Sequence, residues 1–158
     1  MKNNKGFSLV ELIIVIAIMA ILVGVMAPQL IKYIEKTNVS SDAQTCDSIR
    51  SAMTTAMLDP EVVNGADAGI PTDTTGTAVN TISLTTDFGK AVKEILGITA
   101  WTDIKFKSHV GSATASGLTY VISNGNSVTV YLSSSDATGK KGNGSGTTQH
   151  IGAGPEIK

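Results

Sequence analysis

The stretch KGFSLVELIIVIAIMAILVGVMAP, Lys5–Pro28, decides how this chain is organised. An uncharged run extends from Leu12 to Ile31, which is enough for a helix that crosses a hydrocarbon core of about 30 Å. The run is apolar on all sides, a pattern typical of a membrane span or of the interior of a large assembly. One carboxylate, Glu11, stands directly before it. A charge left alone in hydrocarbon costs roughly 2.5–3.5 kcal/mol on insertion scales, so this acid needs a partner.

The position of the apolar run argues against an ordinary secretory signal. Such signals have an apolar stretch of about 7–15 residues that is followed by a cleavage site with small residues. Here the run is longer, and the small residue Gly6 precedes it. The sequence therefore predicts that residues 1–6 are a leader peptide and that the apolar segment is retained after processing.

Length, charge and cysteine content set further bounds. The 158 residues suit one modest domain with appendages, and the net charge of −1 gives no indication of nucleic-acid binding. Cys46 is the single cysteine, so no intramolecular disulfide is possible. We interpret it as a small apolar residue on a helix face.

A second, amphipathic pattern follows Pro28. Apolar residues recur at steps of three to five, with the charged residues mostly between them. The apolar positions are Ile31, Ile34, Val39, Ala43, Cys46, Ile49, Met53, Ala56 and Met57, and the charged ones are Lys32, Glu35, Lys36, Asp42, Asp47 and Arg50. Asp59-Pro60 stops the pattern, because a residue before proline is disfavoured in a helix. The sequence thus predicts one helix over 7–58, whose segment 7–30 is the transmembrane or assembly half.

The next part, 59–133, reads as a small α+β head. Residues 59–78 have the composition of a loop, and Thr86 or Asp87 caps a short helix that ends before Gly97 and has Phe88, Val92, Ile95 and Leu96 on one face. Strands are predicted at 104–110, 118–123 and 127–133, and the last two flank the hairpin signal Asn124-Gly125-Asn126. We expect an α+β fold in which this antiparallel sheet packs on the long helix. The Gly- and Ser-rich stretch 134–158 is predicted to be mostly flexible.

Sites for chemistry are not indicated. His109 and His150 are far apart and lack the spacing of metal ligands, and no Ser/His/Asp or Cys/His arrangement has supporting context. The glycine-rich stretch 139–146 has no strand before it or helix after it, unlike a phosphate-binding loop. We therefore expect no metal, no cofactor and no enzymatic activity.

The amino-terminal stretch KGFSLVELIIVIAIMAILVGVMAPQL closely resembles that of type IV pilins and the related pseudopilins. The resemblance implies that prepilin peptidase cleaves after Gly6 and that Phe7 becomes an N-methylated amino terminus. It implies that Glu11 registers each subunit in a filament, and that Pro28 is the proline that bends the helix. The family often has a second glycine in the first half of the apolar run, where this chain has Ala20.

The resemblance also implies a life cycle. The chain would be a structural subunit, stored as a single-pass precursor in the cytoplasmic membrane. The pilus assembly machinery would polymerise it into a homo-oligomeric helical filament on the cell surface, with the adhesion and twitching motility associated with such pili. Many Gram-negative members close the outer domain with a disulfide, and its absence here favours a Gram-positive type of organism.

Elementary electrostatics gives Glu11 a partner if cleavage occurs. Cutting before Phe7 creates an α-amine with a pKa of about 7.7–8, one helical turn from the carboxylate. Within a subunit or between staggered subunits, this ion pair would fix the register of parallel helices. In the alternative reading, Glu11 sits at the membrane interface beside Lys5. Two alternative functions remain: a pseudopilin of a type II secretion or DNA-uptake machine, and a membrane-anchored enzyme or receptor.

Overall fold

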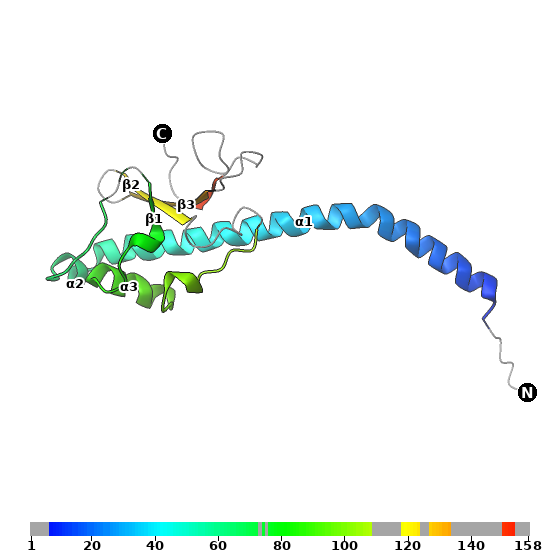
Figure 1. The fold of residues 1–158 in the computed structure, drawn as a ribbon, viewed down its shortest axis with the longest axis horizontal. Coiled ribbons are helices and arrows are strands. Elements are labelled where there is room, and N and C mark those ends of the chain that lie inside the picture. Colours follow the sequence, from blue (N-terminus) through cyan, green and yellow to red (C-terminus); the bar gives the residue numbers. More distant parts are fainter. Residues whose placement is uncertain are drawn as a thin grey trace, which may run out of the picture. The chain divides into compact units, whose positions relative to one another are not determined.

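A computed structural model describes residues 7–72, 74, 76–108, 118–123, 127–133 and 150–153. The chain divides into two compact units, Met1–Lys36 and Thr37–Lys158, here called the apolar unit and the globular unit. Its elements are α1 (Leu9–Leu58), α2 (Pro60–Val63), β1 (Thr77–Ala78), the 3-10 turn η1 (Val79–Thr81), α3 (Asp87–Leu96), the 3-10 turn η2 (Trp101–Asp103), β2 (Leu118–Ser123), β3 (Ser127–Ser133) and β4 (His150–Ala153) (Figure 1). The predicted α+β class is confirmed.

The long helix is present, with bounds close to the prediction. Helix α1 begins at Leu9, two residues after the predicted start, and continues through Pro28 without a break. It ends at Leu58, because Asp59 takes an extended conformation (φ −70°, ψ 122°) before Pro60. Asp59 then caps α2 by accepting a hydrogen bond from the Glu61 N–H, at 2.9 Å. The predicted loop 59–78 therefore contains a short helix, and also β1 at its end.

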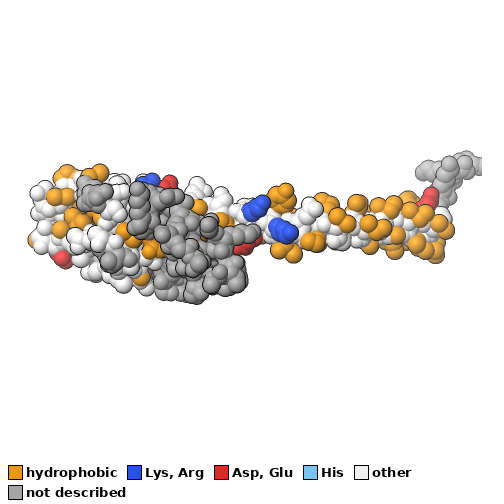
Figure 2. All heavy atoms as spheres, turned by 90° about the horizontal axis from the view of Figure 1, so that it is seen from above, with side chains coloured by type: hydrophobic (Ala, Val, Ile, Leu, Met, Phe, Trp, Pro, Cys, Tyr) orange, Lys and Arg blue, Asp and Glu red, His pale blue; other side chains and the backbone are white. Residues whose placement is uncertain are grey.

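The first part of α1 has an exposed apolar surface. From Leu9 to Ile34 its large apolar side chains are between 43% and 73% exposed. Figure 2 shows hydrophobic side chains over the visible face of this part of the helix. By length and composition, α1 is apolar enough to cross a membrane.

The second part of α1 forms the core of the globular unit. The buried residues include Cys46, Ile49, Met53 and Ala56, all predicted on the apolar stripe, and also Ala52. The prediction was wrong for the start of the stripe, since Ile31 and Ile34 are 68% and 52% exposed. The buried stripe packs in one cluster with residues of α3 and of the sheet, among them Phe88, Val92, Leu118 and Val130. Within this unit, the sheet and α3 lie on two sides of α1 (Figure 1).

The sheet has the strand order β1-β2-β3-β4, and each neighbouring pair is antiparallel. The predicted hairpin is confirmed by the pairing of β2 with β3, in which Leu118 lies opposite Leu132 and Ser123 opposite Ser127. Its turn, 124–126, is outside the described residues. The alternating residues predicted to face the core are all buried, namely Leu118, Tyr120, Ile122, Val128, Val130 and Leu132.

Two predictions about the sheet need correction. Residues 104–108 are not a strand, and the backbone N–H groups of Lys107 and Ser108 donate to the Asp42 carboxylate instead. Residues 109–110 are not described. The stretch predicted to be flexible, 134–158, contains β4, which pairs with β3 and buries Ile151. The rest of that stretch is outside the described residues.

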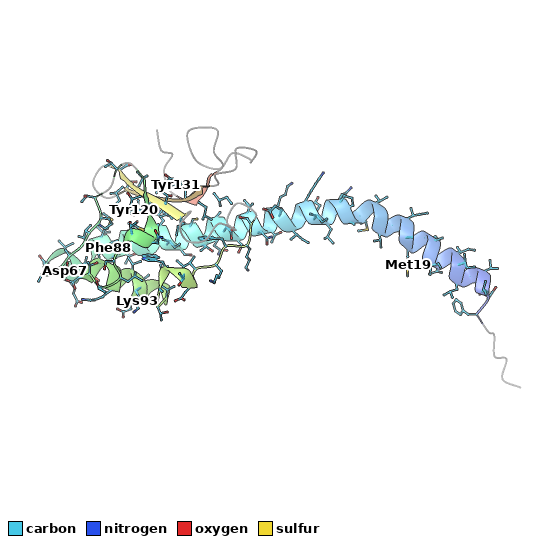
Figure 3. All side chains as sticks on the ribbon, in the orientation of Figure 1. Met19, Asp67, Phe88, Lys93, Tyr120 and Tyr131 are labelled. Atoms are coloured by element: carbon cyan, nitrogen blue, oxygen red, sulfur yellow. The ribbon has the colours of Figure 1, made fainter. Side chains whose placement is uncertain are left out.

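Helix α3 has the predicted caps. The Thr86 hydroxyl accepts a hydrogen bond from the Gly89 N–H at 3.2 Å, and Gly97 ends the helix in the left-handed conformation at φ 65°. Phe88 and Val92 are fully buried, and Figure 3 shows where Phe88 lies on the ribbon. Ile95, predicted on the same face, is 50% exposed, so the buried face of this helix does not include it.

Candidate functional site

The sequence predicts functional residues at the start of the apolar segment, and the structure describes most of them. Gly6 is outside the described residues. Phe7 precedes α1 and is 84% exposed, Glu11 lies in the first turn, and Pro28 lies much further along the helix. Phe7 and Glu11 are thus neighbours in one helix end, whereas Pro28 is not part of that site.

Glu11 forms a capping interaction that links it to Ser8. The Ser8 N–H donates to Oε2 of Glu11 at 2.8 Å, and the Ser8 hydroxyl accepts from the Val10 N–H at 3.4 Å. The Ser8 carbonyl accepts from the Leu12 N–H at 3.3 Å. This reciprocal arrangement is a variant of the capping box, in which the Ser8 hydroxyl accepts from the Val10 N–H instead of the Glu11 N–H, and it satisfies backbone N–H groups that the helix itself leaves unpaired.

Reading the sequence missed Ser8, although a signal was present. The pattern Ser-x-x-Glu directly before an apolar run, here Ser8 to Glu11, is the sequence signature of a capping box. The cap means that Glu11 is not a lone carboxylate in the uncleaved chain. Its carboxylate has a hydrogen-bond partner within its own chain, at the helix end where the backbone dipole favours a negative charge.

The carboxylate retains capacity for a second partner. Among the described residues, Oε1 of Glu11 has no hydrogen-bond partner, and the side chain is exposed. An ionised carboxylate offers about four lone-pair sites, so a cation could bind Glu11 without displacing Ser8. The site therefore supplies one charged acceptor at the end of an apolar surface.

The surface around Glu11 is strongly apolar. Leu9, Val10, Leu12 and Ile13 are between 51% and 73% exposed. Full burial of a large aliphatic side chain gains about 1.5–3 kcal/mol, so covering this surface would be strongly favourable. Such a surface is suited to insertion into lipid or to packing against other helices, with the carboxylate as the element that needs a specific partner.

The buried polar groups of the globular unit form a separate cluster. Asp42 is 1% exposed, and it accepts hydrogen bonds from the Lys107 N–H and the Ser108 N–H, each at 2.9 Å, and from the Ser108 hydroxyl at 2.5 Å. Sequence reasoning had placed Asp42 among the charged residues between the apolar positions, and the structure corrects this. Through these hydrogen bonds, Asp42 holds the segment 104–108 against α1.

Cys46 lies one turn after Asp42 and is also buried. Its thiol donates to the Ile151 carbonyl, with the sulfur 3.6 Å from the oxygen. Burial, and next the charge of Asp42, raise the pKa of the Cys46 thiol to about 12. The thiol therefore stays protonated at neutral pH and packs as a small apolar group, as its interpretation from the sequence required.

Side chains that could ligate a metal ion do not gather in the part of the chain that the structure describes. Within that part, no group of three or more His, Cys, Asp or Glu residues could hold a metal ion. His109 is outside the described residues, and the side chain of His150 is not described.

Comparison with known proteins gives a consistent picture of the amino-terminal segment. The family model described as the prokaryotic N-terminal methylation motif matches residues 1–27. A fimbrial protein of Pseudomonas aeruginosa is 37% identical over 67 residues, 42% of this chain and 44% of that protein. A type IV major fimbrial protein FimA of Dichelobacter nodosus is 42% identical over 56 residues, 35% of this chain and 36% of that protein.

A longer similarity connects the chain to the prepilin peptidase-dependent protein D of Escherichia coli K12. That protein is 29% identical over 122 residues, which are 75% of this chain and 81% of the relative. The chain spans less than half the length of the fimbrial proteins that it matches. No solved structure matches the chain. The relatives come from Gram-negative bacteria, so the expected Gram-positive source has no support.

Proposed function

Because this chain is a type IV pilin-like protein, we propose that it is a structural subunit of a type IV pilus. In this proposal a prepilin peptidase cleaves after Gly6, and Phe7 becomes the N-methylated amino terminus. The apolar segment, 7–30, then holds the subunit in the cytoplasmic membrane. The pilus assembly machinery transfers it from there into a helical filament of identical subunits on the cell surface.

The observation that carries the proposal is the apolar surface of α1 with Glu11 at its start. From Leu9 to Ile34, the large apolar side chains of the helix are at least 43% exposed. Lipid can cover this surface in the membrane, and the helices of neighbouring subunits can cover it in a filament. Transfer between two apolar environments costs little, because lipid tails are as apolar as the side chains.

Glu11 would give the assembly its register. Moving this carboxylate into an apolar interior is unfavourable unless a cation meets it. The Phe7 α-amine created by cleavage is such a cation, either from the same subunit or from the next one. Because Ser8 holds Oε2, the remaining oxygen is available to the amine. Sliding the helix by one turn would separate the charges, so one alignment is favoured.

A pseudopilin of a type II secretion or DNA-uptake machine is the alternative, since the same amino-terminal motif serves both. We place the pilus first because two of the relatives named above are fimbrial proteins. An enzyme or receptor anchored by the same helix has no comparable support. Micrographs of cells that produce the protein at native levels separate the first two, because long surface filaments would favour the pilus.

A substitution at Glu11 tests the proposed register directly. Gln also serves at this position of a capping box, so Glu11→Gln removes the charge and preserves the helix cap. We expect normal amounts of processed subunit in the membrane and few or no filaments in the sheared surface fraction. Glu11→Asp keeps the charge with a shorter reach, so an intermediate yield is expected.

Ser8→Ala is the matched control. It removes the hydroxyl from the cap and keeps the carboxylate, so helix stability should fall by about 1 kcal/mol while filaments still form. Wild-type filament yield from Glu11→Gln would contradict the role of the charge. Amino-terminal mass spectrometry of the subunit tests processing independently, and recovery of intact Met1 would contradict cleavage after Gly6.

A further inference from the structure

A cationic and aromatic cluster lies on α1 at the end of its uncharged run. It consists of Gln29, Lys32, Tyr33 and Lys36, which line one shallow hollow on the helix surface and are here called the exit cluster. Their spacing of three and four residues places them on one face of the helix. The Lys36 ammonium nitrogen lies 5.8 Å from the centroid of the Tyr33 ring, within the range of a cation–π contact. Figure 2 shows basic side chains gathered on α1 next to the stretch covered by hydrophobic ones.

The opposite face of the same turns is apolar. Leu30, Ile31 and Ile34 are 60%, 68% and 52% exposed. Lysine side chains place their alkyl stems along apolar surface and their ammonium groups in the polar layer, and tyrosine is enriched at the level of lipid headgroups. The exit cluster therefore has the composition of a helix segment at the boundary between hydrocarbon and headgroups.

We propose that the exit cluster binds the phosphate groups of anionic phospholipids on the membrane face from which the globular unit emerges. This inference rests on the proposed function, because it requires that the apolar unit spans a membrane. Two ammonium groups one helical turn apart provide six donors for phosphate oxygens, and the Gln29 amide adds two more. The cluster then fixes the depth at which α1 sits before assembly.

The neighbouring charge does not cancel the cluster. Glu35 lies on the same turn, but it is partly buried and engaged within the chain. At 100° per residue it projects about 60° from Lys32 and about 100° from Lys36, on the flank of the cluster. The processed chain would lack Lys2 and Lys5, which leaves Lys32 and Lys36 as the basic side chains of the apolar unit.

The test uses the full-length protein in mild detergent with an equimolar mixture of phosphatidylglycerol and phosphatidylcholine. Native mass spectrometry measures the ratio of the two lipids retained on the protein. A lysine near an anionic surface contributes roughly fivefold in affinity, so we expect an enrichment of phosphatidylglycerol of about tenfold to thirtyfold. Lys32→Gln with Lys36→Gln should reduce it to near unity. Lys93→Gln with Lys105→Gln, the matched control in the globular unit, should leave it unchanged.

Several outcomes would overturn the inference. These are no enrichment in the wild type, the same enrichment in the exit-cluster variant, or equal losses in both double variants. If the exit-cluster variant still enriches phosphatidylglycerol but forms no filaments, the two lysines contact a neighbouring subunit rather than a lipid. That result would overturn the lipid site. Insertion into phosphatidylcholine nanodiscs is scored separately. Its failure would overturn the membrane stage of the proposed function as well, whereas normal insertion without enrichment would overturn the lipid site alone.

Discussion

The two parts of α1 both carry apolar side chains, which are exposed in the first part and buried along one stripe of the second. From Leu9 to Ile34 every large apolar side chain is at least 43% exposed, whereas Cys46, Ile49 and Met53 are at most 1% exposed. The later part is covered by α3 and the sheet of its own chain. The earlier part has no such cover among the described residues. One continuous helix thus combines a buried core stripe with an exposed apolar surface.

The polar groups of the two parts differ in the same way. Asp42 is buried with three hydrogen bonds, two from backbone N–H groups and one from the Ser108 hydroxyl. Glu11 is exposed, with one hydrogen bond to the Ser8 N–H. A buried carboxylate must be satisfied within the fold, but an exposed one at an apolar surface can still receive an external partner. This difference separates a structural acid from one suited to assembly.

The largest effect is expected from removing the first part of α1. A fragment that begins between Gln29 and Ile34 lacks most of the exposed apolar surface and retains the whole core of the globular unit. We expect it to be soluble, folded and monomeric at moderate concentration, while the full processed chain requires detergent or forms filaments. Analytical ultracentrifugation and circular dichroism measure this. An aggregated or unfolded fragment would mean that the second part of α1 is not stabilised by α3 and the sheet.

Truncating one side chain in each part of α1 should change the free energy of unfolding by amounts that differ by several kcal/mol. Ile49 is 1% exposed within the core cluster, so Ile49→Ala should reduce the free energy of unfolding of the globular unit by about 2–5 kcal/mol. Ile18 is 52% exposed, and Ile18→Ala should change it by less than about 0.5 kcal/mol.

Trp101 provides the measurement for this pair. It is the single tryptophan, it is 7% exposed, and its Nε1–H donates to the Ile82 carbonyl at 2.9 Å. Its fluorescence should therefore report unfolding of the globular unit during urea titration in mild detergent. Equal effects of Ile49→Ala and Ile18→Ala would contradict the division of α1 into a buried and an exposed part.

Substitution of the buried acid Asp42 should cause a smaller loss in the free energy of unfolding. Asp42→Ala leaves the Lys107 and Ser108 N–H groups without their acceptor, so we expect a loss of about 2–4 kcal/mol. Asp47 is the matched control, because it lies on the exposed face of α1 in an ion pair with Arg50. Asp47→Ala should cost less than about 1 kcal/mol. If both variants unfold at the same urea concentration, the proposed fastening of 104–108 to α1 is wrong.

The features predictable from the sequence were those encoded by local periodicity and capping. The apolar run, the stop at Asp59-Pro60, the caps Thr86 and Gly97 and the β2–β3 hairpin all depend on neighbouring residues. The stripe from Cys46 to Met57 was also found, because helical spacing alone places its members on one face.

The features that escaped prediction depend on contacts between distant residues. Asp42 and Ser108 are 66 positions apart, and nothing in either segment indicates the bond that replaces a strand at 104–108. Strand β4 is short and follows a Gly- and Ser-rich stretch, so its pairing with β3 depends on tertiary structure rather than on propensity. Ser8 is the exception, because the Ser-x-x-Glu pattern was available in the sequence. For the candidate site, the sequence thus supplied the residues, and the structure supplied the hydrogen bond that orients Glu11.

The smallest expected effect concerns the Cys46 thiol at alkaline pH. Its pKa is raised from 9.0 to about 12, chiefly by burial, so above pH 9 the unfolded chain releases this proton and the folded chain retains it. Stability is therefore unaffected well below pH 9 and falls as the pH rises towards 12, by about 1.4 kcal/mol at pH 10. Cys46→Ala removes this contribution, so the difference in unfolding free energy between wild type and variant should shrink from pH 8 to pH 10. The thiol should also react with an aromatic disulfide reagent at pH 8 only after unfolding. Rapid reaction in the folded protein, with no change in the difference between the two proteins, would show that this part of α1 is not covered by β4.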